Sequence, residues 1–177
     1  MNQIESLHFK ILDETDLILL YQWFEEPTIN QWYAKGRSWS FENIKKKYLP
    51  RILGKEKIPS FIIYIEDIPL GYIPYYSLSD YFPEGIMHSN HFLFHLYRPD
   101  ELVGIDLFIA FKDKRGKGLG VHILNNFLRK LPSNIHAVIL DPESHNQPAI
   151  CCYEKAGFKC TDYSEDETHV LLIKTLQ

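Results

Sequence analysis

The chain has 177 residues, of which 45% are hydrophobic and 24% are charged, and its formal net charge at neutral pH is −4. This length suits one compact unit with a sizeable core, so we expect a single domain over residues 1–177. The excess of acidic residues argues against nucleic acid or an anionic membrane as the main partner, because phosphate groups attract a basic face.

The cysteines and the first residues indicate where the protein works. Only Cys151, Cys152 and Cys160 are present, an odd number in which two neighbours in the chain would form a strained pair. The opening stretch "MNQIESLHFKILDETD" has no basic region followed by an apolar run, and no segment approaches the roughly 18 apolar residues of a membrane helix. We therefore expect a cytoplasmic protein that is not embedded in a membrane.

The first elements predicted along the chain are a strand, two helices and a hairpin. Apolar alternation over residues 7–11 predicts a strand, and the run after "DETD" predicts a helix that stops before Pro27. Helical spacing over residues 41–53, with Ser40 as the cap, predicts a second helix that Pro50 bends or shortens. "SFIIYIEDIPLGYIPYYSL" then predicts two antiparallel strands joined around "EDIP".

The second half of the chain alternates between strands and helices after an irregular stretch. Residues 80–103 hold no sustained period, and we treat them as an irregular, lid-like insertion. The pattern is then a strand "GIDLFIAF", a loop, a helix "LGVHILNNFLRKL", a strand "AVILDP", a helix ending at Gly157, and a closing strand "HVLLIKTL". Two strands joined through a helix are expected to run parallel with a right-handed crossover.

The loop before the first of these later helices indicates an anion site. Backbone N–H groups at a helix N-terminus can surround a diphosphate, and glycine removes the side chains that would block it. The loop combines such glycines with cations, namely Gly116, Gly118 and Gly120 with Lys114, Arg115 and Lys117. A plain basic surface turn is the alternative. A P-loop is excluded because no Gly-Lys-Ser/Thr follows, and a Rossmann site is disfavoured because Gly-x-Gly-x-x-Gly does not occur here.

The segment "RGKGLG" at residues 115–120 resembles the acetyl-coenzyme A signature of the GNAT acetyltransferase superfamily, in which Gln or Arg is followed by two residues, Gly, one residue, and Gly or Ala. The motifs "QWY", "YLP", "GY", "GID", "RGKGLG", "DP" and "CYEKAGF" also fall in the order of its aminoglycoside 6′-N-acetyltransferase branch. The resemblance runs from about residue 32 to 158 and fails across residues 80–100. It implies an α/β (α+β) fold, with a mixed, mostly antiparallel central sheet flanked by helices and with splayed parallel central strands.

The resemblance also implies acetyl-CoA as the acetyl donor. The strand at Phe108 and Ile109 would pair through its backbone with the pantetheine arm, as an added strand would. The expected donor-binding residues are Phe108, Ile109, Lys114, Arg115, Gly116, Lys117, Gly118, Leu119, Gly120 and Asn146. For Asn146, a helix cap is an equal alternative.

Two residues are the candidates for catalysis by resemblance. Asp106 would bind the acceptor ammonium and take its proton, directly or through water, while Tyr153 would protonate the departing thiolate as a general acid. The alternatives are an acid at a strand end that is satisfied by the backbone or a lysine, and a core aromatic residue.

The acceptor expected from the resemblance is a primary amine of an aminoglycoside antibiotic, so that acetylation would confer resistance. Its expected contacts are Asp106, Asp141, Trp32, Tyr33 and Asp80, for which turn or core roles remain open. Alternatives are another amine, such as a polyamine, a siderophore precursor or a lysine-like metabolite, and a non-catalytic sensor of acyl-CoA.

A metal is not expected. His88, His91 and His95 have spacings of three and four, but apolar residues fill the same stretch and no His-Glu-x-x-His pattern is present. The acidic run at residues 162–167 predicts a solvated hairpin turn.

Overall fold

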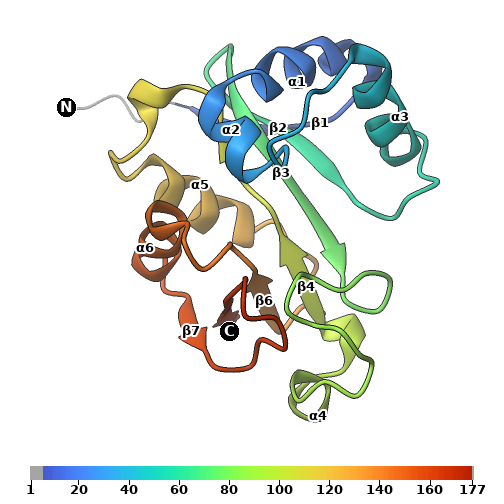
Figure 1. The fold of residues 1–177 in the computed structure, drawn as a ribbon, viewed down its shortest axis with the longest axis vertical. Helices are drawn as coiled ribbons and strands as arrows, with labels where there is room; N and C mark the ends of the chain where they lie inside the picture. Colours follow the sequence, from blue (N-terminus) through green and yellow to red (C-terminus); the bar gives the residue numbers. More distant parts are fainter. Residues whose placement is uncertain (1–5, 177) are drawn as a thin grey trace. The chain divides into compact units, whose positions relative to one another are not determined.

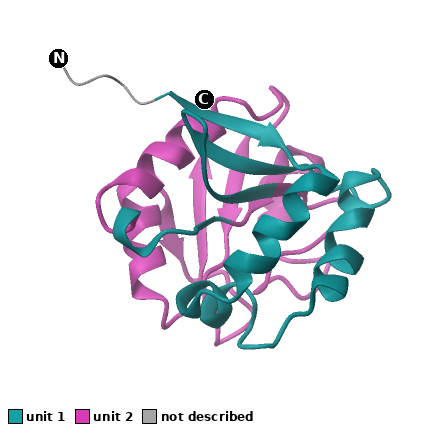
Figure 2. Cartoon of the chain, turned by 90° about the horizontal axis from the view of Figure 1, so that it is seen from above, with its two compact units in different colours: residues 1–74, 107–114 teal, residues 75–106, 115–177 magenta. Residues whose placement is uncertain are grey.

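The computed structural model describes residues 6–176, whose helices and strands are labelled in Figure 1. These residues form two compact units. The described residues of unit 1 are 6–74 and 107–114, and those of unit 2 are 75–106 and 115–176; Figure 2 shows the units in teal and magenta. The predicted fold class is confirmed, because helices accompany mostly antiparallel strands and one central pair is parallel. No helix within residues 6–176 has the length and apolar character needed to cross a membrane.

Unit 1 contains three helices and four stretches of strand among its described residues. The helices are α1 (Leu17–Phe24), α2 (Pro27–Trp32) and α3 (Phe41–Ile52), with short 3-10 turns at Glu14–Asp16 and Lys112–Lys114. The strands are β1 (Leu7–Ile11), β2 (Ser60–Ile65), the part of β3 (Ile68–Ser77) up to Pro74, and β5 (Phe108–Ile109). β1 pairs with β2, β2 with β3, and β3 with β5, all antiparallel, so the predicted hairpin is confirmed.

Local caps explain where the helices of unit 1 begin. Ser40 and Asn43 form a reciprocal capping box at the start of α3, and the helix continues through Pro50 to Ile52, so the proline does not shorten it. α2 was not predicted. Its N-cap is Glu26, whose carboxylate accepts the Ile29 N–H at 2.9 Å, whereas Ser, Thr, Asp and Asn are the common caps. A proline also occupies the first turn.

Unit 1 buries a dense aromatic core. Phe24, Tyr48 and Tyr72 are almost fully buried, and the ring of Phe108 lies 5.7 Å from Tyr72 and 6.2 Å from Phe24. The Tyr72 hydroxyl donates to Ser60 Oγ at 2.8 Å and accepts from the Arg51 guanidinium at 3.0 Å. The buried Tyr72 hydroxyl is therefore satisfied both as a donor and as an acceptor.

Gly71 is the position in this core where a larger residue is expected to cost most. It pairs with Ile109, and a Cβ atom built on it would overlap the backbone oxygen of Phe108. Because strand backbone cannot move as a side-chain tip can, Gly71→Ala is expected to destabilise the protein by about 1–3 kcal/mol. Urea unfolding measures this as a lower midpoint. The control is Ile68→Ala on the same strand, whose side chain is exposed; equal midpoints for the two variants would contradict the expectation.

Unit 2 contains a sheet whose centre is a parallel pair. The strands are the end of β3 from Tyr75 on, β4 (Leu102–Ile105), β6 (Ala137–Leu140), β7 (Lys159–Thr161) and β8 (Leu171–Thr175), in the order β3-β4-β6-β8-β7. The helices are α4 (Leu93–Leu96), α5 (Leu119–Leu128) and α6 (Gln147–Lys155), with a 3-10 turn at Pro99–Glu101. β4 and β6 are parallel and the other pairs are antiparallel, which confirms the predicted strand–helix–strand crossover through α5.

The stretch "GIDLFIAF" is not one continuous strand, as its apolar run predicted. β4 ends at Ile105 and β5 begins at Phe108, so Asp106 and Leu107 lie outside both strands. In β3, Pro74 lies between the residues that pair with Ile105 and with Phe108, and proline has no N–H to donate to a ladder. Asp106 therefore directly follows the carboxyl end of β4.

The insertion at residues 80–103 is irregular apart from α4, the 3-10 turn and the start of β4, and it is bonded to the chain before β8. The Met87 N–H donates to the Glu165 carboxylate at 2.6 Å, and the Glu165 N–H donates to the Gly85 carbonyl at 2.8 Å. His91 is buried, with Nε2 at 2.7 Å from the Tyr163 carbonyl and Nδ1 accepting the Leu93 N–H. These bonds give His91 a structural role.

Candidate active site

The glycine loop precedes α5 in unit 2. Gly116 and Gly118 have φ values of 74° and 83°, in the left-handed region, and a Cβ on either would meet nothing within 4 Å. Glycine is thus required for the backbone conformation and leaves the approach to the loop open. Gly118 is the N-cap of α5, so it has no side chain to accept the N–H groups of the first turn.

The charges around this loop favour an anion. Lys114 and Lys117 are exposed, and Arg115 and Leu119 are half-buried, whereas Gly120 is buried at the start of the helix. Backbone N–H groups at the positive end of a ten-residue helix, in a glycine conformation that keeps side chains away, fit a diphosphate. The predicted donor-binding role of these residues thus has a suitable geometry, and the role itself stays a prediction.

The other predicted donor-binding residues lie in different settings. Phe108 and Ile109 form β5 of unit 1, where they pair with Tyr72 and Gly71. Asn146 in unit 2 is the N-cap of α6 and accepts the Ala149 N–H at 3.4 Å, so the cap role that the sequence left open is observed.

Two carboxylates follow neighbouring parallel strands of unit 2. Asp106 comes directly after β4 and Asp141 directly after β6, so both belong to the carboxyl edge of the parallel pair. Burial, and then the negative charge of Asp106, raise the pKa of Asp141 to about 7. The Glu84 N–H donates to Asp141 Oδ2 at 2.6 Å, which opposes this rise in pKa. Two close carboxylates of this kind favour a bound cation, because a cation relieves their repulsion.

Tyr153 lies on α6 and is buried. Burial raises the pKa of its phenol well above the usual range, and the charges of Cys152, Asp106 and Asp141 raise it further. The hydroxyl therefore stays protonated at neutral pH and can donate a proton or a hydrogen bond. The ring also lies 6.4 Å from Phe158, so the core packing that the sequence left open is present as well.

The predicted aromatic contacts to the acceptor lie in unit 1. Trp32 is the last residue of α2 and Tyr33 follows it, both half-buried. The Tyr33 ring lies 4.7 Å from Phe108 and 5.8 Å from Phe24, both at steep interplanar angles. Asp80, the remaining predicted contact, is exposed in the turn after β3 in unit 2.

Glu84 is the residue at this site that sequence reasoning missed. Its N–H reaches Asp141 from 57 positions away in the chain. Glu84 sits in an irregular segment without periodicity, so no local signal indicates this contact. Its carboxylate also raises the pKa of Asp141, which means that the insertion contributes charge as well as a hydrogen bond.

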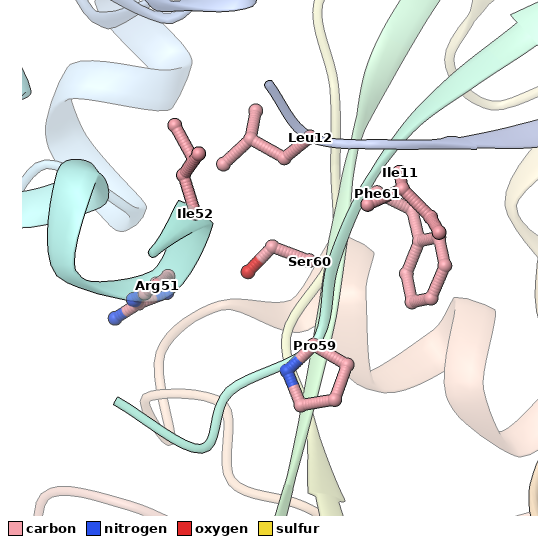
Figure 3. Close-up of a pocket in the computed structure, with 7 residues that line it drawn as sticks. All are labelled: Ile11, Leu12, Arg51, Ile52, Pro59, Ser60 and Phe61. Atoms are coloured by element: carbon pink, nitrogen blue, oxygen red, sulfur yellow. The ribbon is translucent and has the colours of Figure 1, made fainter. Parts of the chain in front are cut away.

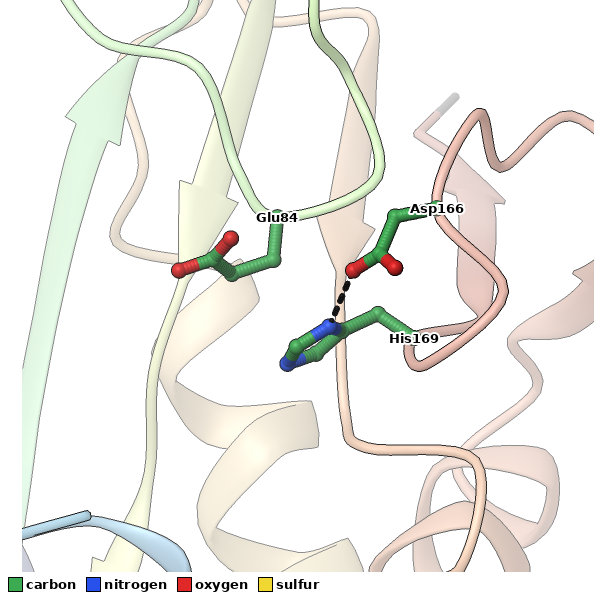
Figure 4. Close-up of side chains that lie close together, drawn as sticks. All are labelled: Glu84, Asp166 and His169. Carbon is green, nitrogen blue, oxygen red and sulfur yellow. Dashed lines mark hydrogen bonds and ion pairs between the residues drawn. The ribbon is translucent and has the colours of Figure 1, made fainter.

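Glu84 also belongs to a group of titratable side chains with Asp166 and His169 (Figure 4). His169 Nδ1 lies 2.6 Å from Asp166 Oδ2, and the Thr168 N–H and hydroxyl donate to the same carboxylate. The Thr168 and His169 hydrogen bonds lower the pKa of Asp166 to about 2. This carboxylate therefore organises the turn before β8, in agreement with the predicted hairpin turn.

A separate cavity of about 120 Å³ in unit 1 contains none of the predicted site residues (Figure 3). It is lined by Ile11, Leu12, Arg51, Ile52, Pro59, Ser60 and Phe61. Its polar groups are engaged, because Ser60 Oγ donates to the Ile58 carbonyl and Arg51 bonds to Tyr72 and Glu56. The cavity therefore has an apolar and structural character.

Comparison with known proteins finds acetyltransferases that are similar over most of this chain. The family model described as "Acetyltransferase (GNAT) domain" matches residues 13–164. An aminoglycoside N(6′)-acetyltransferase type 1 of Klebsiella pneumoniae is 26% identical over 181 residues, which cover 99% of this chain and 86% of the relative.

Solved structures agree in fold over nearly the whole chain. A crystal structure of the aminoglycoside acetyltransferase AAC(6′)-Ib in complex with coenzyme A is 26% identical, with a TM-score of 0.79 and coverage of 96% of this chain and 95% of that one. A structure of AAC(6′)-Ib with ribostamycin and coenzyme A has the same identity and a TM-score of 0.80, and covers 96% of this chain and 93% of that one.

Proposed function

The chain belongs to the GNAT acetyltransferase family, and from this membership we propose that it transfers the acetyl group of acetyl-CoA to the 6′-amine of an aminoglycoside. The observation that carries the proposal is the carboxylate pair Asp106 and Asp141, which follows parallel strands near the buried phenol of Tyr153. Likeness over nearly the full length to enzymes named for this acceptor supports it. Because the family match runs through both units, we propose that residues 1–177 act as one domain.

The chain's donor side would be the glycine loop. Its backbone N–H groups from Gly116 to Gly120 would hold the diphosphate, with Lys114, Arg115 and Lys117 adding positive charge at the rim. Phe108 and Ile109 would contribute strand backbone, and Leu119 and Asn146 would complete the donor contacts. Acetyl-CoA supplies the activated acetyl thioester when it is bound.

The chain's acceptor side would be the carboxylate pair. Asp106 would accept a proton from the acceptor ammonium, leaving a neutral amine that can attack the thioester carbonyl of the donor. Asp141, whose pKa is raised to about 7, would share the binding of the cation. Tyr153 keeps its proton on Oη at neutral pH and would be the general acid that protonates the departing thiolate. Trp32, Tyr33 and Asp80 are the remaining proposed acceptor contacts.

A thiol-release assay over a panel of amines tests the proposal. Kanamycin, tobramycin and ribostamycin are expected to release free coenzyme A, and NMR of the product is expected to place the acetyl group on the 6′-nitrogen. The matched control is an aminoglycoside that carries a hydroxyl group at the 6′ position, which is expected to release none. Faster turnover of spermidine or lysine than of the aminoglycosides would contradict the proposed acceptor and indicate another amine in its place. Binding of acetyl-CoA without thiol release by any amine would indicate a sensor.

A further inference from the structure

The amino group of Lys47 on α3 lies close to four aromatic rings of unit 1, which we call the aromatic box: Phe24, Tyr33, Trp39 and Tyr48. Lys47 Nζ lies 5.1 Å from the ring centroid of Trp39 and 5.5 Å from that of Tyr48. The distances to Tyr33 and Phe24 are 5.7 and 6.0 Å. All four are within the range of about 6 Å over which a ring face attracts a cation.

The aromatic box is held together by contacts that do not involve Lys47. The ring of Phe24 packs at steep angles against Trp39 at 5.2 Å, Tyr33 at 5.8 Å and Tyr48 at 6.1 Å. The indole N–H of Trp39 donates to the Ala34 carbonyl at 3.1 Å. Phe24 and Tyr48 are also almost fully buried. Shortening the side chain at position 47 is therefore expected to leave the four rings in place.

An arrangement of several ring faces around one point is the usual way in which proteins recognise an ammonium group. Lys47 presents such a group from α3, the helix that also carries Tyr48, so its local concentration at the box is high and an external cation must compete with it. Its charge also repels a second cation at the same place. The box is thus a site of ammonium chemistry that the chain fills with its own lysine, and the Arg51 guanidinium also lies 5.2 Å from the Tyr48 ring centroid.

We propose that the aromatic box is an ammonium-binding site and that Lys47, by occupying it, is a specificity-determining residue for the acceptor. Lys47 would keep the cationic groups of an acceptor away from the face of Tyr33. This second part rests on the proposed function, in which Tyr33 contacts the acceptor. The first part concerns binding alone.

Titration with tetramethylammonium tests the first part, with tryptophan fluorescence as the readout. Lys47→Ala is expected to show a saturable change in fluorescence. The tetramethylammonium concentration at half-saturation is expected to be lower than in the unchanged protein by at least about tenfold. Adding Trp39→Phe to this variant is expected to remove the change, which assigns it to the box. The matched control is Lys46→Ala, an exposed neighbour on the same helix, which is expected to behave like the unchanged protein. Thermal melting of each variant, with Lys47→Gln as a second substitution, verifies the fold; absence of saturable binding in folded Lys47 variants would overturn the inference.

Acetyl-transfer kinetics test the second part. Lys47→Ala is expected to lower KM for kanamycin by about tenfold relative to KM for a monoamine, with kcat little changed. Equal changes for the two acceptors would overturn the specificity role even if the box binds tetramethylammonium. If no amine is acetylated by any variant, the proposed function fails, while the fluorescence result still decides whether the box is an ammonium site.

Discussion

Asp106→Asn is expected to lower kcat/KM for acetyl transfer by about 100- to 1,000-fold, because the amide keeps the size of the side chain and cannot accept a proton. The substitution also removes the negative charge that helps to raise the pKa of Asp141. Asp141 is therefore expected to titrate at lower pH in this variant. Steady-state thiol release measures the first effect, and carboxyl chemical shifts followed by NMR against pH measure the second.

The two readouts separate catalysis from general damage. Calorimetry with coenzyme A is expected to show unchanged donor affinity in Asp106→Asn, since the glycine loop is intact. The control is Asp100→Asn, an exposed carboxylate in the same unit, which is expected to change neither rate nor pH behaviour. Full activity in Asp106→Asn would remove Asp106 from the role of base and leave Asp141 as the candidate.

Tyr153→Phe is expected to lower kcat by about 100-fold with little change in KM, because the ring remains and only the donating hydroxyl is lost. Burial keeps the pKa of this phenol well above its usual range. In the unchanged protein, the rate is therefore expected not to fall through deprotonation of Tyr153 near pH 10, where an ordinary tyrosine ionises. The pH profile of kcat measures this.

A purely structural tyrosine would give a different result. The ring packs near Phe158, and phenylalanine preserves that contact, so a packing role predicts full activity in Tyr153→Phe. Tyr97→Phe is the matched control, since its hydroxyl bonds to Thr175 elsewhere in unit 2. Equal rates for these two variants would contradict a general-acid role and show that Tyr153 contributes only by packing.

The sequence predicted the elements that carry a strong local signal. The Ser40 cap, the hairpin around "EDIP", the helix after the glycine loop and the parallel strands are all found. α2 was missed because six residues with an acidic cap give little periodicity. The strand through Asp106 was predicted as continuous because an apolar run gives no sign of a break in its ladder.

The candidate site shows the same division between local and distant signals. The glycine loop could be predicted because its conformation and charge are properties of consecutive residues. The contact of Glu84 with Asp141, and the packing of four rings around Lys47, join residues from separate elements without a shared motif. Such contacts depend on tertiary packing, which local patterns in a single sequence do not reveal.

The hydrogen bond from the Glu84 amide to Asp141 has a consequence for divergence among relatives. The donor is a main-chain group, so it persists when any residue other than proline replaces Glu84, but it moves whenever residues are gained or lost nearby. Changes in the length of that segment can therefore alter the proton affinity of Asp141 while the glycine loop before α5 stays unchanged. The set of amines that serve as acceptors can therefore change during evolution without a change in how the acetyl donor is bound.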